Sequence, residues 1–112
     1  MKKITPLLVM LFCFEFISAQ KLEMYENKFF INGKDTLRYR ILYPEKYKKW
    51  KKYPLIVFLH GSGERGRDNE AQLIHGGDLF VREDIRKHFP AIVIFPQCPA
   101  DSVWAKTKRI NN

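Results

Sequence analysis

The first half of the chain carries an alternating pattern of apolar and polar residues. Leu37, Tyr39, Ile41 and Tyr43 alternate with Arg38, Arg40 and Leu42, which is typical of a strand with one buried face. A short apolar and aromatic run, residues 28–31, comes before it. Asn32 and Gly33 lie between the two runs, and this dipeptide is the strongest short signal for a tight hairpin turn. We therefore predict an antiparallel hairpin, followed by a polar turn or short helix over residues 45–52.

The second half carries continuous apolar runs instead. Residues 55–59 and 91–95 are rich in β-branched and aromatic residues, the pattern of strands that are buried on both faces. Between them come a glycine-rich loop, residues 60–68, and two segments of helical character, residues 71–80 and 81–89, with a break expected near Gly76 and Gly77. This order predicts a βαβ unit with a parallel strand pair and a right-handed crossover. The fold class is therefore α/β.

The sheet that these strands can build is incomplete. Two buried strands and a hairpin fall short of a doubly wound sheet, so we expect the strand around Ile92 to need further strands on its open side. The tail after Trp104 has no strand signal. The chain is expected to stop in the middle of a domain.

The N-terminus has the layout of a secretory signal peptide. Lysines at positions 2 and 3 precede an apolar run from Ile4 to Ile17, and small residues lead up to Ala19. We predict a signal peptide over residues 1–19 and a domain over residues 20–112, hence a secreted or periplasmic protein. An uncleaved anchor and a lipid anchor at Cys13 are the alternatives. After cleavage only one cysteine remains, so no internal disulfide is expected.

The charge is strongly positive and partly concentrated. The formal net charge is +8, and one short segment holds much of it. This segment reads either as a patch for a polyanion or as a solvated turn before a buried strand, and the second interpretation is favoured because no nucleic-acid-binding motif is present. The segment contains Lys46, Lys48, Lys49, Lys51 and Lys52, interleaved with Tyr47, Trp50 and Tyr53.

The glycine-rich loop allows two chemical interpretations. Its three glycines match the dinucleotide pattern G-x-G-x-x-G, but no acidic residue ends the next strand to hold a ribose. The favoured interpretation is an oxyanion loop, in which backbone N–H groups stabilise the anion that acyl transfer creates. A strand end followed by His60 and Gly61 leads to the expected donors, the N–H groups of Ser62 and Gly63. Glycine was expected here because it lets the backbone turn sharply and keeps side chains away from the donors.

A longer stretch resembles a known family. Residues 54–66 (PLIVFLHGSGERG), residues 68–76 (DNEAQLIHG) and residues 96–99 (PQCP) with Trp104 look like the start of secreted α/β-hydrolases. These are the predicted peptidase and esterase group near polyhydroxybutyrate depolymerases, feruloyl esterases and prolyl-oligopeptidase-like enzymes. The resemblance covers about residues 37–104. It implies an exported serine hydrolase that acts on carboxylic esters, or on peptides, without a cofactor.

The resemblance also implies roles for single residues. His60 would support the oxyanion loop structurally. The residues themselves leave two interpretations for Arg65: it braces the loop with Glu64 through a mutual or backbone contact, which is favoured, or it lines the substrate cleft. Trp104 either shapes the cleft or packs in the core. Asp68 is expected to cap the helix that follows it, and Cys98 to be a buried small residue. No spacing among the three histidines suggests a metal site.

The family's nucleophile motif, G-x-S-x-G, does not occur in the chain. The serines are Ser18, Ser62 and Ser102, and none has the flanking glycines of that motif in the required place. We therefore expect the isolated chain to be inactive, with a small or polymeric ester as the substrate of the whole enzyme. Nucleic acid and stable membrane insertion after signal cleavage are not expected. The alternatives are a non-catalytic remnant with a basic patch and a nucleotide-binding domain.

Overall fold

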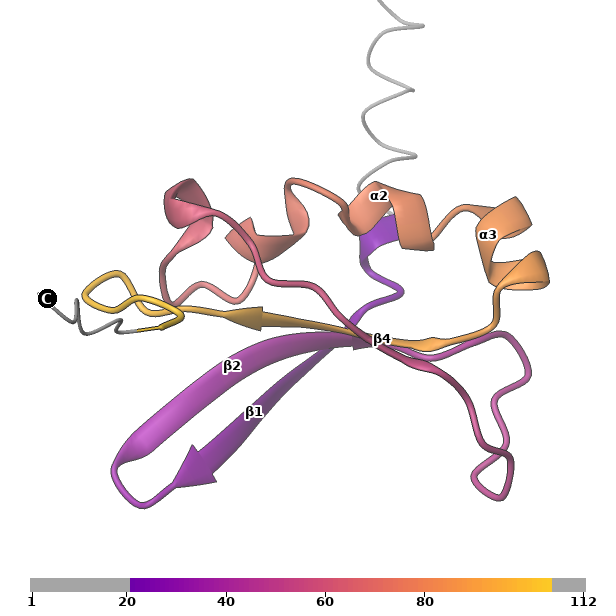
Figure 1. Cartoon of the computed structure of the whole chain (residues 1–112), viewed down its shortest axis with the longest axis horizontal. Helices are drawn as coiled ribbons and strands as arrows, with labels where there is room; N and C mark the ends of the chain where they lie inside the picture. The colour runs from indigo at the N-terminus through magenta and orange to yellow at the C-terminus, as the bar shows by residue number, and fades with distance from the viewer. Residues whose placement is uncertain (1–20, 106–112) are drawn as a thin grey trace, which may run out of the picture.

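A computed structural model describes residues 21–105 of the chain (Figure 1). The predicted signal peptide and its cleavage site lie outside the described residues. The sheet consists of β1 (Glu26–Asn32), β2 (Asp35–Leu42), β3 (Leu55–Val57) and β4 (Ile92–Gln97). The helical segments are the 3-10 helices η1 (Ser62–Glu64) and η2 (Ala71–Leu73) and the α-helices α2 (Gly77–Phe80) and α3 (Glu83–His88).

The four strands form one mixed sheet in the order β1-β2-β4-β3. β1 and β2 are antiparallel, with Asn32 opposite Asp35 and Gly33 at φ 61° in the turn, so the predicted hairpin is confirmed. β2 runs antiparallel to β4, and β3 runs parallel to β4. The predicted parallel pair is therefore confirmed too.

The strand edges differ from the prediction. β4 lies between β2 and β3, so the expected open side of the Ile92 strand is wrong, and within residues 21–105 the edge strands are β1 and β3. Pro54 O accepts from the N–H of Ile92, and the N–H of Phe58 donates to Ile94 O. Because hydrogen-bonding direction alternates along a strand, the peptide groups of Leu55 and Val57 point away from β4.

The helices cover one face of the sheet (Figure 1). On this face Phe95 is 0% exposed and contacts the rings of Tyr25 and Phe58 at centroid distances of 5.4 and 4.7 Å. The hydroxyl of Tyr25 donates to Gly77 O at 2.8 Å, which satisfies its buried polar end. The rest of this core consists of Leu42, Leu73, Val81, Ala91 and Val93.

The other face of the sheet is open in the part of the chain that the structure describes. Leu55 and Val57 are 59% and 53% exposed, and Leu59 is also exposed. The prediction that residues 55–59 are buried on both faces is therefore wrong for the described chain. The reason is that a continuous apolar run indicates a strand suited to burial on both faces, whereas its actual burial depends on which elements are present to cover it.

The helical region is less regular than predicted. Only α3 agrees broadly with its expected span, and residues 71–80 form η2, a turn and the four-residue helix α2. Gly76 has φ 99°, and a Cβ built on it would lie 2.9 Å from the ring of Phe58. A helix cannot continue through such a residue, and the close approach of Phe58 fixes the break. None of the helices within residues 21–105 is long and apolar enough to cross a bilayer.

Candidate active site

Two loops meet at the carboxyl ends of the parallel strands. The glycine-rich loop leaves β3, and residues 98–104 leave β4; both lie at the left of the sheet in Figure 1. In open α/β sheets, ligands bind at this edge. The contacts between these two loops therefore define the candidate site.

His60 joins the two loops from a buried position. Its ring is 5% exposed, and Nε2 accepts a hydrogen bond from the N–H of Cys98 at 2.9 Å. An accepting Nε2 carries no proton, so the proton is on Nδ1, which donates to Gly61 O at 2.6 Å. Trp104 Nε1 donates to His60 O at 2.9 Å, and the two rings lie 4.9 Å apart. With both ring nitrogens occupied, His60 is unsuited to act as a general base.

The short helix η1 presents Ser62 and Gly63 to solvent. Both residues are exposed, and their N–H groups donate to no carbonyl outside their own turn in the described part of the chain. Arg65 holds this turn in place: its Nε donates to Ser62 O and its Nη1 to Ser102 O, both at 3.0 Å. Arg65 thus makes the backbone contact expected of a bracing residue while remaining exposed at the same edge.

The two glycines before Glu64 do not adopt a left-handed backbone conformation. Gly61 has φ −78°, and neither Gly61 nor Gly63 is among the positive-φ residues. A Cβ on Gly63 would meet nothing within 4 Å, whereas one on Gly61 would lie 3.2 Å from Glu64 Oε2. Any L-residue can adopt the φ of Gly61, so backbone conformation does not require glycine there. Glycine is favoured because a side chain at this position would crowd the carboxylate of Glu64. At Gly63 the absence of a side chain leaves the turn open to a ligand.

The carboxylate of Glu64 contacts a residue outside the turn. Its side chain is nearly buried, and Oε1 lies 3.0 Å from Nε2 of the exposed His75. Of the two contacts expected for Glu64 and Arg65, the backbone contact is the one that Arg65 makes. Glu64 holds the glycine loop against the segment that follows η2.

A buried amide fixes the far end of the glycine loop. Gln97 is buried; its Nε2 donates to Asp68 Oδ1 at 2.7 Å and to Glu64 O at 3.2 Å, and its Oε1 accepts the N–H of Asn69 at 2.7 Å. The hydrogen bond from Gln97 holds the pKa of Asp68 below its usual range, assisted by backbone N–H groups of Glu70 and Ala71. Those two N–H groups lie at the start of η2, so Asp68 caps the following helical turn as predicted.

Asn69 carries the same network to the hairpin. It is buried, with φ 57°, a conformation that asparagine tolerates better than most residues. Its Nδ2 donates to Asn27 Oδ1 and to Tyr39 O, and its carbonyl accepts from Arg40 Nε at 2.6 Å. Gln72 Nε2 donates to its side-chain oxygen. The sequence analysis assigns no role to Gln97 or Asn69. Their position as polar residues beside predicted strands is the feature of the sequence that could have indicated a buried hydrogen-bond network.

Cys98 is buried, as predicted, and its backbone binds both loops. Its N–H donates to His60, and its carbonyl accepts the N–H of Gly66 at 3.0 Å. Trp104, by contrast, is partly exposed beside His60. The burial of Cys98 places its thiol away from a substrate, whereas Trp104 lies where it could contact one.

The geometry gives little support to the nucleotide alternative. The dinucleotide pattern depends on the N-terminus of a helix that directly follows the loop. Here the three-residue helix η1 lies within the loop, and the helix that follows the loop, η2, also has only three residues. For metals, no three candidate His, Cys, Asp or Glu ligands gather among residues 21–105.

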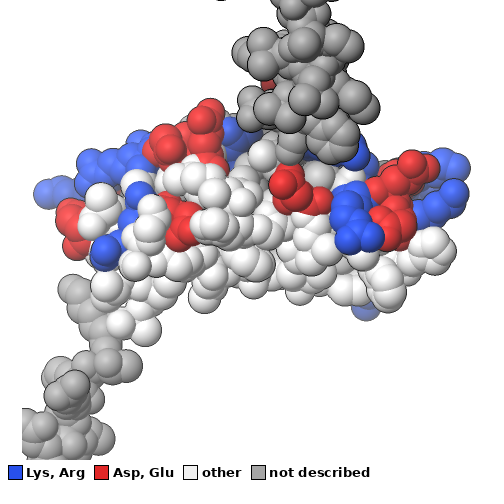
Figure 2. Space-filling view, turned by 90° about the horizontal axis from the view of Figure 1, so that it is seen from above, with Lys and Arg blue, Asp and Glu red and all other residues white. Residues whose placement is uncertain are grey.

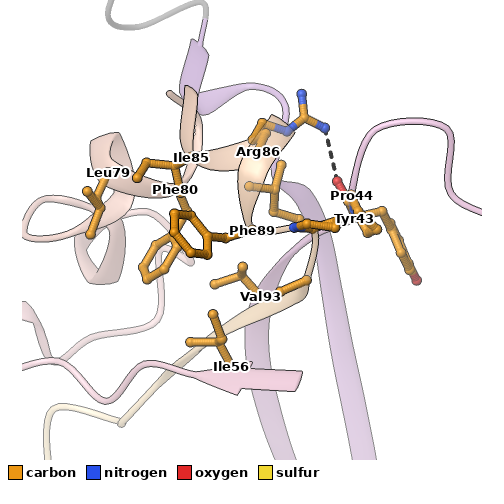
Figure 3. A pocket seen from close by; sticks show the side chains of 12 residues that line it. Tyr43, Pro44, Ile56, Leu79, Phe80, Ile85, Arg86, Phe89 and Val93 are labelled. Atoms are coloured by element: carbon orange, nitrogen blue, oxygen red, sulfur yellow. Dashed lines mark hydrogen bonds between the residues drawn. The ribbon is translucent and has the colours of Figure 1, made fainter. Parts of the chain in front are cut away.

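An apolar cavity of about 300 Å³ lies at the opposite end of the sheet (Figure 3). It is bounded by side chains of α2 and α3 and by residues near the start of β4 and the end of β2. Arg86 lies at its margin and donates from Nη2 to Tyr43 O at 3.0 Å. Because the glycine loop leaves the other end of β3, this cavity is separate from the candidate site. Its labelled lining residues include Ile56, Phe80, Phe89 and Val93.

Comparison with known proteins gives a likeness among solved structures. No family model matches the chain, and no curated protein matches it. Among solved structures, it is similar to one described as the crystal structure of a thermostable esterase, with 33% sequence identity and a TM-score of 0.68. The match covers 75% of this chain and 24% of the esterase, so the chain spans about a quarter of that protein's length. The mixed four-stranded sheet is therefore similar to part of an esterase.

Proposed function

We propose that the chain supplies the oxyanion loop of an exported serine hydrolase that acts on carboxylic esters. The observation that carries this proposal is the exposed turn of Ser62 and Gly63, which directly follows β3 and is braced from both sides by His60 and Arg65. The likeness to a thermostable esterase supports the same class of reaction. Esters are preferred to peptides as substrates on this ground, and the ester can be small or polymeric.

In the proposed reaction, the loop acts when the ester carbonyl becomes tetrahedral. The carbonyl oxygen gains negative charge and accepts hydrogen bonds from fixed N–H donors about 3 Å away. The N–H of Ser62 or Gly63 is one donor, and a second comes from the residue after the nucleophile. Bracing matters because donors that are already oriented need no reorganisation during the reaction. No cofactor takes part.

The remaining machinery is proposed to lie outside the described residues. Hydrolysis through an acyl-enzyme also needs a nucleophile, a base and an acid that orients the base. His60 has both ring nitrogens occupied, and Ser62 lies at the donor position itself. The chain alone should therefore neither turn over nitrophenyl esters nor react with a fluorophosphonate probe. Labelling of the chain at Ser62 or Ser102 would place the nucleophile here and overturn this assignment.

The donor role is tested in a product of the reading frame extended beyond residue 112, provided that it contains the G-x-S-x-G motif. There, Ser62→Pro removes one N–H, and kcat should fall on the order of a hundredfold or more. Ser62→Ala keeps the N–H and so separates the hydroxyl from the backbone donor. An equal loss in both variants would assign the effect to the side chain and contradict the donor role.

Export is proposed on the sequence of residues 1–19. The small residues before Gln20 are the type that signal peptidase accepts, so cleavage is expected after Ala19. N-terminal sequencing of protein recovered outside the cytoplasm tests this. A mature protein that still begins at Met1 would contradict it.

A further inference from the structure

The connection between β2 and β3 carries a dense positive charge with an exposed aromatic ring. We call residues 46–52 the basic loop; five of its seven residues are lysines, and none is acidic. The adjacent Glu45 has its own cation, since Oε1 lies 3.8 Å from Nη1 of Arg86. Trp50 is 83% exposed. The lysines therefore lack a neutralising carboxylate within the loop, and a large apolar ring lies among them.

Ring contacts and hydrogen bonds give the basic loop a defined conformation. The ring of Tyr47 lies 4.7 Å from that of Tyr43 and 5.5 Å from that of Tyr53, which flank the loop on either side. The hydroxyl of Tyr53 accepts the N–H of Lys48 at 3.2 Å, and the N–H of Lys51 donates to Lys48 O at 3.1 Å. This aromatic base holds the loop in one shape, so its tip is presented without the ordering cost that a disordered tail would incur on binding.

Two lysines of the loop lie over aromatic rings. Nζ of Lys48 is 5.8 Å from the centroid of Trp50, and Nζ of Lys51 is 5.4 Å from that of Tyr53. An indole beside ammonium groups suits the boundary between water and lipid, where an aromatic ring sits among headgroups and lysines face anionic lipids. The side chains of Trp50 and Lys48 are thus already placed together.

The shape of the loop distinguishes between anionic occupants. In Figure 1 the connection between β2 and β3 protrudes from the body of the molecule at the lower right. Single-stranded nucleic acids are bound along charged grooves on which successive bases stack against several aromatic rings. Here one indole is strongly exposed on a protruding tip, and Lys48 lies over it. A protruding tip of this kind fits a flat lipid surface better than it fits a single-stranded nucleic acid.

We propose that the basic loop attaches the protein peripherally to an anionic lipid surface, with Trp50 at headgroup level and the lysines above the lipid phosphates. This is attachment without insertion of a spanning segment, and it does not rest on the proposed esterase activity. The loop enters β3 at its N-terminal end, whereas the glycine loop leaves at the C-terminal end. Attachment through the basic loop therefore leaves the candidate active site away from the lipid surface.

The test is binding of the full chain to phosphatidylcholine vesicles with and without phosphatidylserine, measured by co-sedimentation. The readout is the ratio of the two partition coefficients, because the apolar run of residues 4–17 contributes to binding on both vesicle types. The ratio should be well above one and should fall with added salt. Replacing Lys48, Lys49 and Lys52 together by Gln should lower the ratio on the order of a hundredfold. Trp50→Ala should lower affinity for the anionic vesicles by about tenfold.

A matched control removes the same charge elsewhere. Replacing Lys21, Lys34 and Lys87 by Gln should change the ratio by less than about threefold, because these residues lie outside the loop. Circular dichroism checks that each variant retains its fold. A second readout is tryptophan fluorescence, whose blue shift on anionic vesicles should disappear in Trp50→Phe although Trp104 remains. Equal losses in both lysine triples, no preference for anionic vesicles, or tighter binding to a single-stranded oligonucleotide at the same salt would each overturn the proposal.

Discussion

The backbone N–H of Cys98 donates to Nε2 of His60 across 2.9 Å, and this bond ties together the exits of two parallel strands. Each residue lies just beyond the carboxyl end of its strand, 38 positions apart in sequence. The bond also fixes the tautomer of His60, and therefore the donor role of Nδ1 toward Gly61. His60 thus connects the two strand exits beneath the glycine loop and has no free ring nitrogen with which to act as a base.

Replacing His60 should destabilise the fold substantially. His60→Ala leaves the buried N–H of Cys98 without its acceptor and removes the ring against which Trp104 packs. A loss of about 3 kcal/mol in the free energy of unfolding is expected. Urea unfolding followed by circular dichroism measures it. The matched control is His88→Ala, whose exposed ring hydrogen-bonds to Asp84 O, and it should change stability by less than about 0.5 kcal/mol. Similar losses in both variants would contradict the connector role.

The second prediction concerns the buried amide of Gln97. Gln97→Leu keeps the approximate volume but removes the hydrogen bonds to Glu64, Asp68 and Asn69. The orphaned N–H of Asn69 is buried, so stability should fall by about 3 kcal/mol. Hydrogen exchange should show faster opening of the glycine loop than in Arg67→Leu, an exposed polar-to-apolar change in the same loop. Unchanged exchange across this loop would contradict a bracing role for Gln97.

Asp68 gives a prediction about pH. Because its folded pKa lies below the usual 3.8, the unfolded chain binds this proton more readily, and the carboxylate contributes stability above that value. Asp68→Ala should therefore cost about 1 kcal/mol near neutral pH. The difference between the two proteins should shrink as pH falls below 3.8 and through the folded pKa. Denaturant titrations at a series of pH values measure this, and a difference that grows with acid would refute the assignment.

The sequence predicts the parts of this fold that depend on neighbouring residues. The hairpin follows from Asn32-Gly33 between two strand-like runs, and the β3–β4 pair follows from two apolar runs separated by a crossover. The helical region is predicted less well in its lengths. The break near Gly76 and Gly77 follows from the two glycines, whereas the contact that fixes it, the ring of Phe58 18 residues earlier, does not. In the same way, Gln97 and Asn69 meet across 28 positions. Local pattern carries no information on such pairings.

The last prediction concerns the open edge of β3. Its outward peptide groups lie beside the exposed side chains of Leu55 and Val57, and an uncovered apolar edge of this kind promotes association. The chain should therefore self-associate in sedimentation velocity experiments, and Val57→Lys should shift it toward the monomer by placing a charge at the edge. Ile74→Lys adds the same charge at an exposed apolar residue after η2 and should leave association unchanged. The N-terminal apolar run is common to all three proteins, so a difference between the variants reports on β3. If Ile74→Lys dissolves the assembly as well as Val57→Lys does, net charge governs association and the edge does not.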